Sequence, residues 1–92
     1  MIIADTDLPL YMVIQKFLVA NNLIRSWSDL TAQVQRSRTY FSTLRRTKSN
    51  PSGEVWVAMQ NFLSELTKNC RNETLKRWLR HYIRQIEMEI GQ

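Results

Sequence analysis

Residues 26–46 read SWSDLTAQVQRSRTYFSTLRR, which is the pattern of two short helices joined by a tight turn. Ser26 is placed to cap the first helix, and Asp29 follows three residues later, which is the spacing of a capping box. Leu30 and Val34 are four residues apart and predict the buried side of this helix.

The second helix of this stretch is predicted over residues 38–46. The turn before it falls at residues 35–36, and Ser37 is placed to cap the helix. Phe41 and Leu44, three residues apart, predict its buried side. The face left for solvent carries Arg38, Thr39, Ser42, Thr43 and Arg46.

The positive charge of the chain is concentrated in the same place. Residues 36–48 contain five Lys and Arg and no Asp or Glu, whereas the rest of the chain has eight of each kind. The net charge of +5 is therefore accounted for by this segment. A local excess of this kind favours a surface that meets phosphates. Its cations are Arg36, Arg38, Arg45, Arg46 and Lys48.

The remainder of the chain indicates an all-α protein. Ninety-two residues fit a single domain, 1–92, and only two Gly and two Pro interrupt it. Apolar residues at helical spacing predict further helices from about Pro9 to Asn21, over 54–67 and over 73–90, with a loop between 47 and 53. Asp5, Thr6 or Asp7 is placed to cap the first helix and Asn72 the last.

Several function classes are disfavoured. Cys70 is the only cysteine, so no intrachain disulfide can form, which fits a reducing cytoplasm. No apolar run approaches the length of a membrane helix, and MIIADTD carries acids where a signal peptide would be basic. No catalytic motif is present and His81 has no second ligand at useful spacing, so we expect no enzyme, no metal and no cofactor.

The residues from Leu10 to Leu66 resemble the Cro/lambda-repressor (Xre-type) helix-turn-helix family. The matching features are the capped second helix with Leu30-Thr31, the run SRTYFSTLRR at 37–46, the Pro51-Ser52 loop, and the apolar positions Met59, Phe62, Leu63 and Leu66. The sequence departs from the family pattern in three places. Gln35-Arg36 stand for Gly and an apolar residue, Thr31 for Ala, and Arg45 for a Glu.

The resemblance implies a five-helix fold, with a helix-turn-helix core over 8–67, its motif at 26–46, and an extended C-terminal helix over 72–90. It also implies a DNA-binding transcriptional regulator, with repression favoured, from a phage or other mobile element. Such a regulator would be cytoplasmic and would act in the bacterial cytoplasm or nucleoid, or in a phage-infected host cell. The helix 38–46 would then enter the major groove of double-stranded DNA. Base contacts would come from Arg38, Thr39, Ser42 and Thr43. Phosphate contacts would come from Arg36, Ser37, Tyr40, Arg45, Arg46 and Lys48.

The last helix carries a broad apolar stripe at heptad-like spacing. One interpretation is a homodimer interface that would place two recognition helices on a palindromic operator. The other is that the helix folds back and completes the core of one chain. The residues of the stripe are Leu75, Trp78, Leu79, Tyr82, Ile83, Ile86 and Ile90.

Two other functions remain open. The helix-turn-helix fold could serve as a protein-interaction module, such as an anti-activator or a phage-encoded inhibitor, with little DNA binding. A basic amphipathic module could instead bind RNA or a membrane surface without sequence preference. Loss of sequence preference in Arg38→Ala would favour the regulator, and a stable complex with a protein would favour the interaction module.

Overall fold

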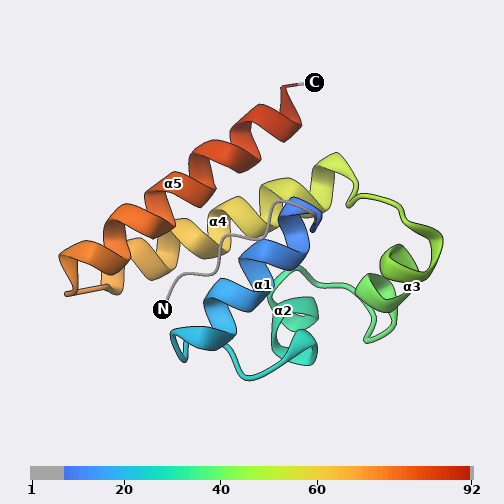
Figure 1. The fold of residues 1–92 in the computed structure, drawn as a ribbon, viewed down its shortest axis with the longest axis horizontal. Helices are drawn as coiled ribbons and strands as arrows, with labels where there is room; N and C mark the ends of the chain where they lie inside the picture. Colours follow the sequence, from blue (N-terminus) through green and yellow to red (C-terminus); the bar gives the residue numbers. More distant parts are fainter. Residues whose placement is uncertain (1–7, 92) are drawn as a thin grey trace. The chain divides into compact units, whose positions relative to one another are not determined.

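The computed structural model describes residues 8–91, and within that range it contains five α-helices and no strand (Figure 1). The all-α prediction is therefore confirmed for these residues. None of these helices has the combined length and apolar character needed to cross a membrane.

The chain divides into two compact units, Met1–Pro51 and Ser52–Gln92. The first unit contains α1 (Leu10–Ala20), α2 (Trp27–Gln33) and α3 (Tyr40–Thr47). The second contains α4 (Gly53–Asn69) and α5 (Glu73–Ile90). The prediction of one domain over 1–92 stays a prediction.

Three aromatic rings, one from each helix, hold the first unit together. Tyr11 of α1 stacks on Phe41 of α3, with ring centroids 5.7 Å apart. Trp27 of α2 lies 5.0 Å from Phe41 and 6.1 Å from Tyr11. Tyr11 and Phe41 are fully buried, so this cluster fixes the position of α3 through its own first turn.

All three helices of the first unit end in the same way. Asn22, Gln35 and Lys48 have φ values of 59°, 57° and 55°, which is the left-handed region. In each case the next residue donates its N–H to a carbonyl five residues back: Leu23 to Leu18, Arg36 to Thr31, and Ser49 to Leu44. This is the Schellman motif, which usually places Gly at the left-handed position. The chain therefore makes three sharp turns without glycine.

The capping box predicted at the start of α2 does not form. Ser26 is the N-cap residue, but its side chain makes no capping hydrogen bond. The Asp29 carboxylate instead accepts from the backbone N–H of Arg25, at 2.7 Å. The prediction that Ser26 caps through its hydroxyl was wrong. The candidate caps Asp5, Thr6 and Asp7 of α1 lie outside the described residues.

The start of α3 differs from the prediction as well. The helix begins at Tyr40, and Arg38 and Thr39 form a turn before it, closed by the Tyr40 N–H donating to the Ser37 carbonyl at 3.1 Å. Ser37 is therefore not the N-cap, because Thr39 occupies that position. The Ser37 hydroxyl lies 3.3 Å from that of Thr39. Propensity favours Ser as a cap, but the short turn delays the helix by two residues.

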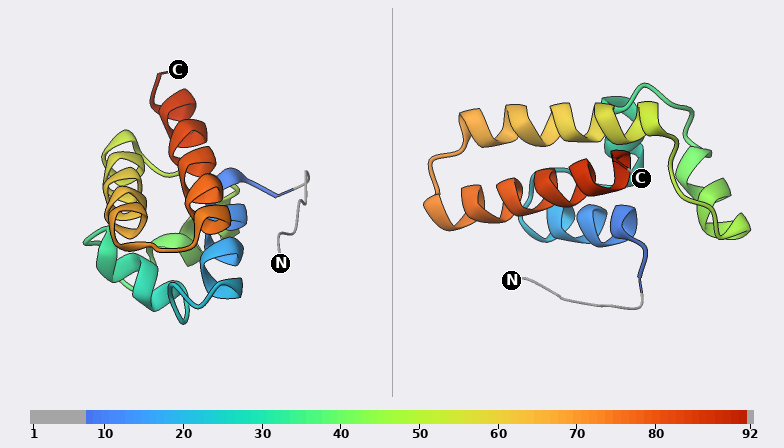
Figure 2. Two further views of the ribbon diagram at one scale, coloured as in Figure 1. Left: turned by 90° about the vertical axis from the view of Figure 1, so that its left-hand side faces the viewer. Right: turned by 90° about the horizontal axis from the view of Figure 1, so that it is seen from above.

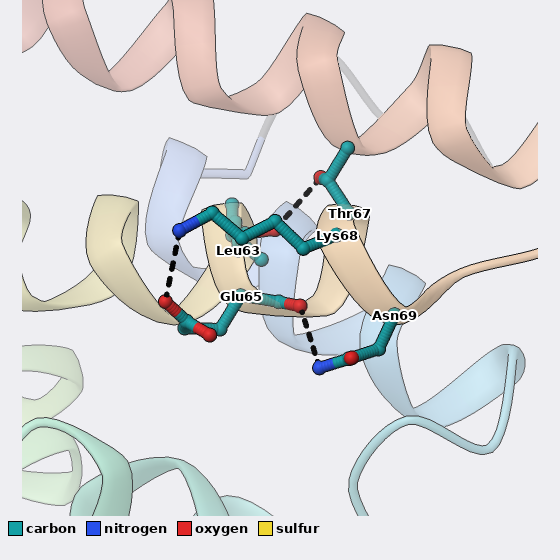
Figure 3. A network of polar contacts seen from close by, with 5 residues as sticks. All are labelled: Leu63, Glu65, Thr67, Lys68 and Asn69. Atoms are coloured by element: carbon teal, nitrogen blue, oxygen red, sulfur yellow. Dashed lines mark hydrogen bonds and ion pairs between the residues drawn. The ribbon is translucent and has the colours of Figure 1, made fainter.

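The second unit is a pair of antiparallel helices that lie side by side (Figure 2). The Asn72 side chain accepts from the Leu75 N–H at 3.1 Å, so the predicted cap and bounds of α5 are confirmed. At the end of α4, Asn69 donates to the Glu65 carbonyl and Thr67 to the Leu63 carbonyl, while Lys68 pairs with the Glu65 carboxylate at 3.3 Å (Figure 3). Thr67 and Asn69 thus each bond back to a carbonyl four residues earlier, within the last turns of the helix.

Candidate nucleic-acid interface

The predicted contact residues form one exposed segment that runs from the turn after α2 to the end of α3. Nine of the ten are exposed, and Tyr40 is half-buried. The exposed residues are Arg36, Ser37, Arg38, Thr39, Ser42, Thr43, Arg45, Arg46 and Lys48. We call this segment, residues 36–48, the basic segment.

The outer face of α3 is set by the two side chains that anchor its inner face. Phe41 and Leu44 are buried, so Ser42, Thr43 and Arg46 must point outward. Arg46 is four residues from Ser42 and three from Thr43, which puts all three on one patch. The structure thus brings a cation and two hydroxyls together on α3, with Arg38 and Thr39 in the turn that leads into it.

Arg45 is held in place by an aromatic ring of the preceding helix. Its guanidinium carbon lies 4.8 Å from the centroid of the Trp27 ring, and its Nη2 donates to the Ser42 hydroxyl at 3.2 Å. A cation over an indole face is attracted by the ring quadrupole. The sequence did not indicate this role for Trp27, since a Trp at this position reads simply as a core residue. The contact links α2 to the charged side of α3.

A second cation–aromatic contact lies at the start of the segment. The Arg36 guanidinium carbon is 5.8 Å from the centroid of the Tyr40 ring, and Tyr40 packs edge-on against Phe41 at 5.2 Å. Tyr40 therefore connects the exposed cation to the buried aromatic cluster. Its packing role is clear, and its predicted phosphate contact stays a prediction.

Acidic side chains are scarce in this unit. Residues 8–51 contain seven Lys and Arg and one acid, Asp29, whose carboxylate accepts from the Arg25 backbone. Within the described part of the chain, no carboxylate pairs with Arg38, Arg46 or Lys48. No carboxylate of residues 8–51 therefore neutralises these charges, and their positive field favours the approach of an anion.

Part of this charge also stabilises α3. Arg45 and Arg46 lie in its last turn, where cations interact favourably with open carbonyl groups. Such interactions are worth about 0.3–1 kcal/mol each and fade beyond the last turn. These interactions give Arg45 and Arg46 a role in helix stability. They do not explain Arg36 and Arg38, which precede the helix.

The charge of Arg45 extends to the core of the unit. Burial raises the pKa of Tyr11 above its usual value of 10.0, and the positive charge of Arg45 acts in the opposite direction and lowers that pKa. The basic segment and the aromatic cluster are therefore electrostatically connected.

The seven residues predicted for a dimer interface differ in exposure. Leu79, Tyr82 and Ile86 are buried in the single chain, as the folded-back interpretation expects. Ile90 is 37% exposed, and Leu75, Trp78 and Ile83 are half-buried. Trp78 contacts His81 and Tyr82, with ring centroids 5.6 and 6.2 Å away. The dimer itself stays a prediction.

Comparisons with protein-family models, with curated proteins and with solved structures found no match to this chain.

Proposed function

We propose that this protein is a sequence-specific transcriptional regulator, a repressor, that binds double-stranded DNA through a helix-turn-helix formed by α2 and α3. Arg38, Thr39, Ser42 and Thr43 would contact base edges in the major groove, and the remaining cations of the basic segment would contact phosphates. The observation that carries the proposal is that Arg38, Arg46 and Lys48 are exposed and that no carboxylate of residues 8–91 pairs with them.

The turn after α2 supports the helix-turn-helix assignment. Gln35 stands where the resembled family usually has Gly, and its φ of 57° is the conformation that Gly adopts readily. The Gln35 and Arg36 N–H groups donate to the carbonyls of Ala32 and Thr31, so the turn is closed without an extra residue. A turn of this conformation supports the assignment, because a glycine at this position would adopt it without strain.

The chemistry of the exposed set also supports base reading. An arginine can donate two hydrogen bonds to guanine O6 and N7, and a threonine can hydrogen-bond a base or touch a thymine methyl group. Arg38 lies in the turn before α3, so its long side chain is not tied into the helix packing. In the homodimer that we propose, two such surfaces would meet the half-sites of a palindrome.

The test is selection of binding sites from a random duplex library with the full chain at one stated salt concentration. It is repeated with Arg38→Ala and with a matched control, Arg71→Ala, which removes an exposed arginine from the loop between α4 and α5. We expect an enriched palindromic sequence that Arg71→Ala retains and Arg38→Ala loses, because a bidentate base contact discriminates by about 1–3 kcal/mol. If Arg38→Ala enriches the same sequence as the natural chain, the proposed base contact of Arg38 is wrong.

The protein-interaction module remains the second candidate, since exposed apolar side chains occur in the second unit. Val57 and Met88 are 43% and 59% exposed. Absence of any enriched duplex, together with a stoichiometric complex with one protein, would favour this function over the regulator.

A further inference from the structure

The exposed face of α5 carries a second group of arginines. Arg77, Arg80 and Arg84 are separated by three and four residues and therefore lie on one face of the helix. All three are exposed. From the first to the last, they span about 10 Å along the helix axis. We call them the arginine row.

The row has no internal partner in the part of the chain that the structure describes. The ion pairs of this unit join Lys68 to Glu65 and Lys76 to Glu73, and neither includes an arginine of the row. Because the guanidinium groups are exposed, they bear no desolvation cost that a buried partner would have to offset. The row is a linear set of three charges open to an external anion.

We propose that the arginine row binds the phosphate backbone of duplex DNA, as a second, sequence-independent contact surface separate from the basic segment. It shares with the proposed function only the class of ligand. A row of arginines fits a row of phosphates, because each planar guanidinium can make two parallel hydrogen bonds to one phosphate.

The composition of the row argues against a purely solubilising face. All three cations are arginines, although lysine is the more strongly hydrated residue and serves solubility equally well. Arginine is the side chain that suits bidentate phosphate binding.

The surroundings of the row argue against other anionic partners. A helix that binds a membrane surface must bury its apolar face in lipid, but Leu79, Tyr82 and Ile86 of α5 are already buried in the protein. A protein partner needs an interface with an apolar centre. The exposed neighbours of the row are Glu73, Thr74, His81, Glu87 and Met88. Met88 is the one apolar side chain among them, and a single exposed methionine does not form such a centre. A polyanionic backbone needs only the charges.

The experiment measures the affinity of the full chain for a duplex of random sequence between about 50 and about 200 mM salt. Three triple variants are compared with the natural chain. Arg77→Gln/Arg80→Gln/Arg84→Gln removes the row, and Arg38→Gln/Arg46→Gln/Lys48→Gln removes charge from the basic segment. Lys16→Gln/Lys68→Gln/Arg71→Gln is a control that removes the same charge from other exposed positions. Circular dichroism and thermal unfolding verify that each variant is folded.

We expect the row variant to reduce the slope of log affinity against log salt by about 2–3, since each neutralised phosphate contributes about 0.9. The control variant should change the slope by less than one such contact. A row variant that behaves like the control would overturn the inference.

The outcome is distinguishable from that of the proposed function. If selection finds no preferred sequence but the row variant still lowers the slope, the inference holds and the proposed function fails. If a preferred sequence is found and the row variant leaves the slope unchanged, only the inference fails. Vesicles that contain phosphatidylserine provide the last arm. Row-dependent binding to vesicles, without a row-dependent change on the duplex, would overturn the inference in favour of a lipid surface.

Discussion

The guanidinium carbon of Arg45 lies 4.8 Å from the centroid of the Trp27 ring. The same ring lies 5.0 Å from Phe41, which is completely buried. One indole therefore contacts both the hydrophobic core and a surface cation. This contact already restricts the side-chain conformations of Arg45 in the free protein. Arg45 therefore loses less conformational entropy when it binds a ligand.

The Arg45–Trp27 contact should appear as a coupling energy. We expect Trp27→Leu and Arg45→Gln together to cost about 0.5–1 kcal/mol less than the sum of the single variants, because either change alone already removes the cation–ring attraction. Urea unfolding of the four proteins measures this difference. The matched pair Trp27→Leu with Arg46→Gln should be additive within about 0.5 kcal/mol, and equal coupling in both pairs would contradict the contact.

The turn at Gln35 should be improved by glycine. We expect Gln35→Gly to stabilise the protein by about 0.5–1 kcal/mol. The left-handed conformation costs a residue with a Cβ about 1–2 kcal/mol, and glycine removes this cost. Part of the gain is offset because glycine loses more conformational entropy on folding. Gln33→Gly is the control, because Gln33 is also exposed but lies in the right-handed last turn of α2. Thermal unfolding should show a higher midpoint for Gln35→Gly and a lower one for Gln33→Gly. A loss of stability in both would mean that the strain at position 35 is absent.

The elements with strong periodic patterns and simple ends were predictable from the sequence. The last helix has its predicted bounds and its Asn72 cap, because the apolar stripe and the cap residue indicate the same start. The start of α3 was placed two residues early. A Ser followed by polar residues fits both a cap and a turn, so local sequence alone does not distinguish the two.

The candidate site was predictable in composition and not in detail. The concentration of Lys and Arg located the basic segment. The sequence predicted that its side chains are exposed, but not which contacts position them. The contact that positions Arg45 depends on the Trp27 ring of another helix, which no local spacing reveals. Arg36 and its partner ring, Tyr40, are only four residues apart. The left-handed Gln35 was foreseeable only through the resemblance, since Gln has no intrinsic preference for that conformation.

The buried and exposed positions of α5 should differ sharply in their effect on stability. Leu79 is fully buried, and Leu79→Ala is expected to cost about 2–5 kcal/mol through lost transfer energy and a residual cavity. Met88 is 59% exposed, and Met88→Ala should stay within about 0.5 kcal/mol. Denaturant unfolding at several protein concentrations gives both values and also tests the homodimer, whose unfolding midpoint must rise with concentration. A midpoint that does not change with protein concentration would contradict the homodimer and favour the interpretation that α5 completes the core of one chain.

Alkaline pH should destabilise the protein through its buried phenols. Burial raises the pKa of Tyr11 and of Tyr82 above the usual value of 10.0. The unfolded chain therefore loses these protons first, so the stability they contribute is complete below that value and is lost as the pH rises through the folded-state pKa. Because Arg45 lowers the pKa of Tyr11, Arg45→Gln should move the titration of that phenol to still higher pH. The comparison is urea unfolding at about pH 8 and about pH 11, where the natural chain should lose more stability than Tyr11→Phe does. An equal loss in both proteins would show that Tyr11 ionises as readily in the folded chain as in the unfolded one.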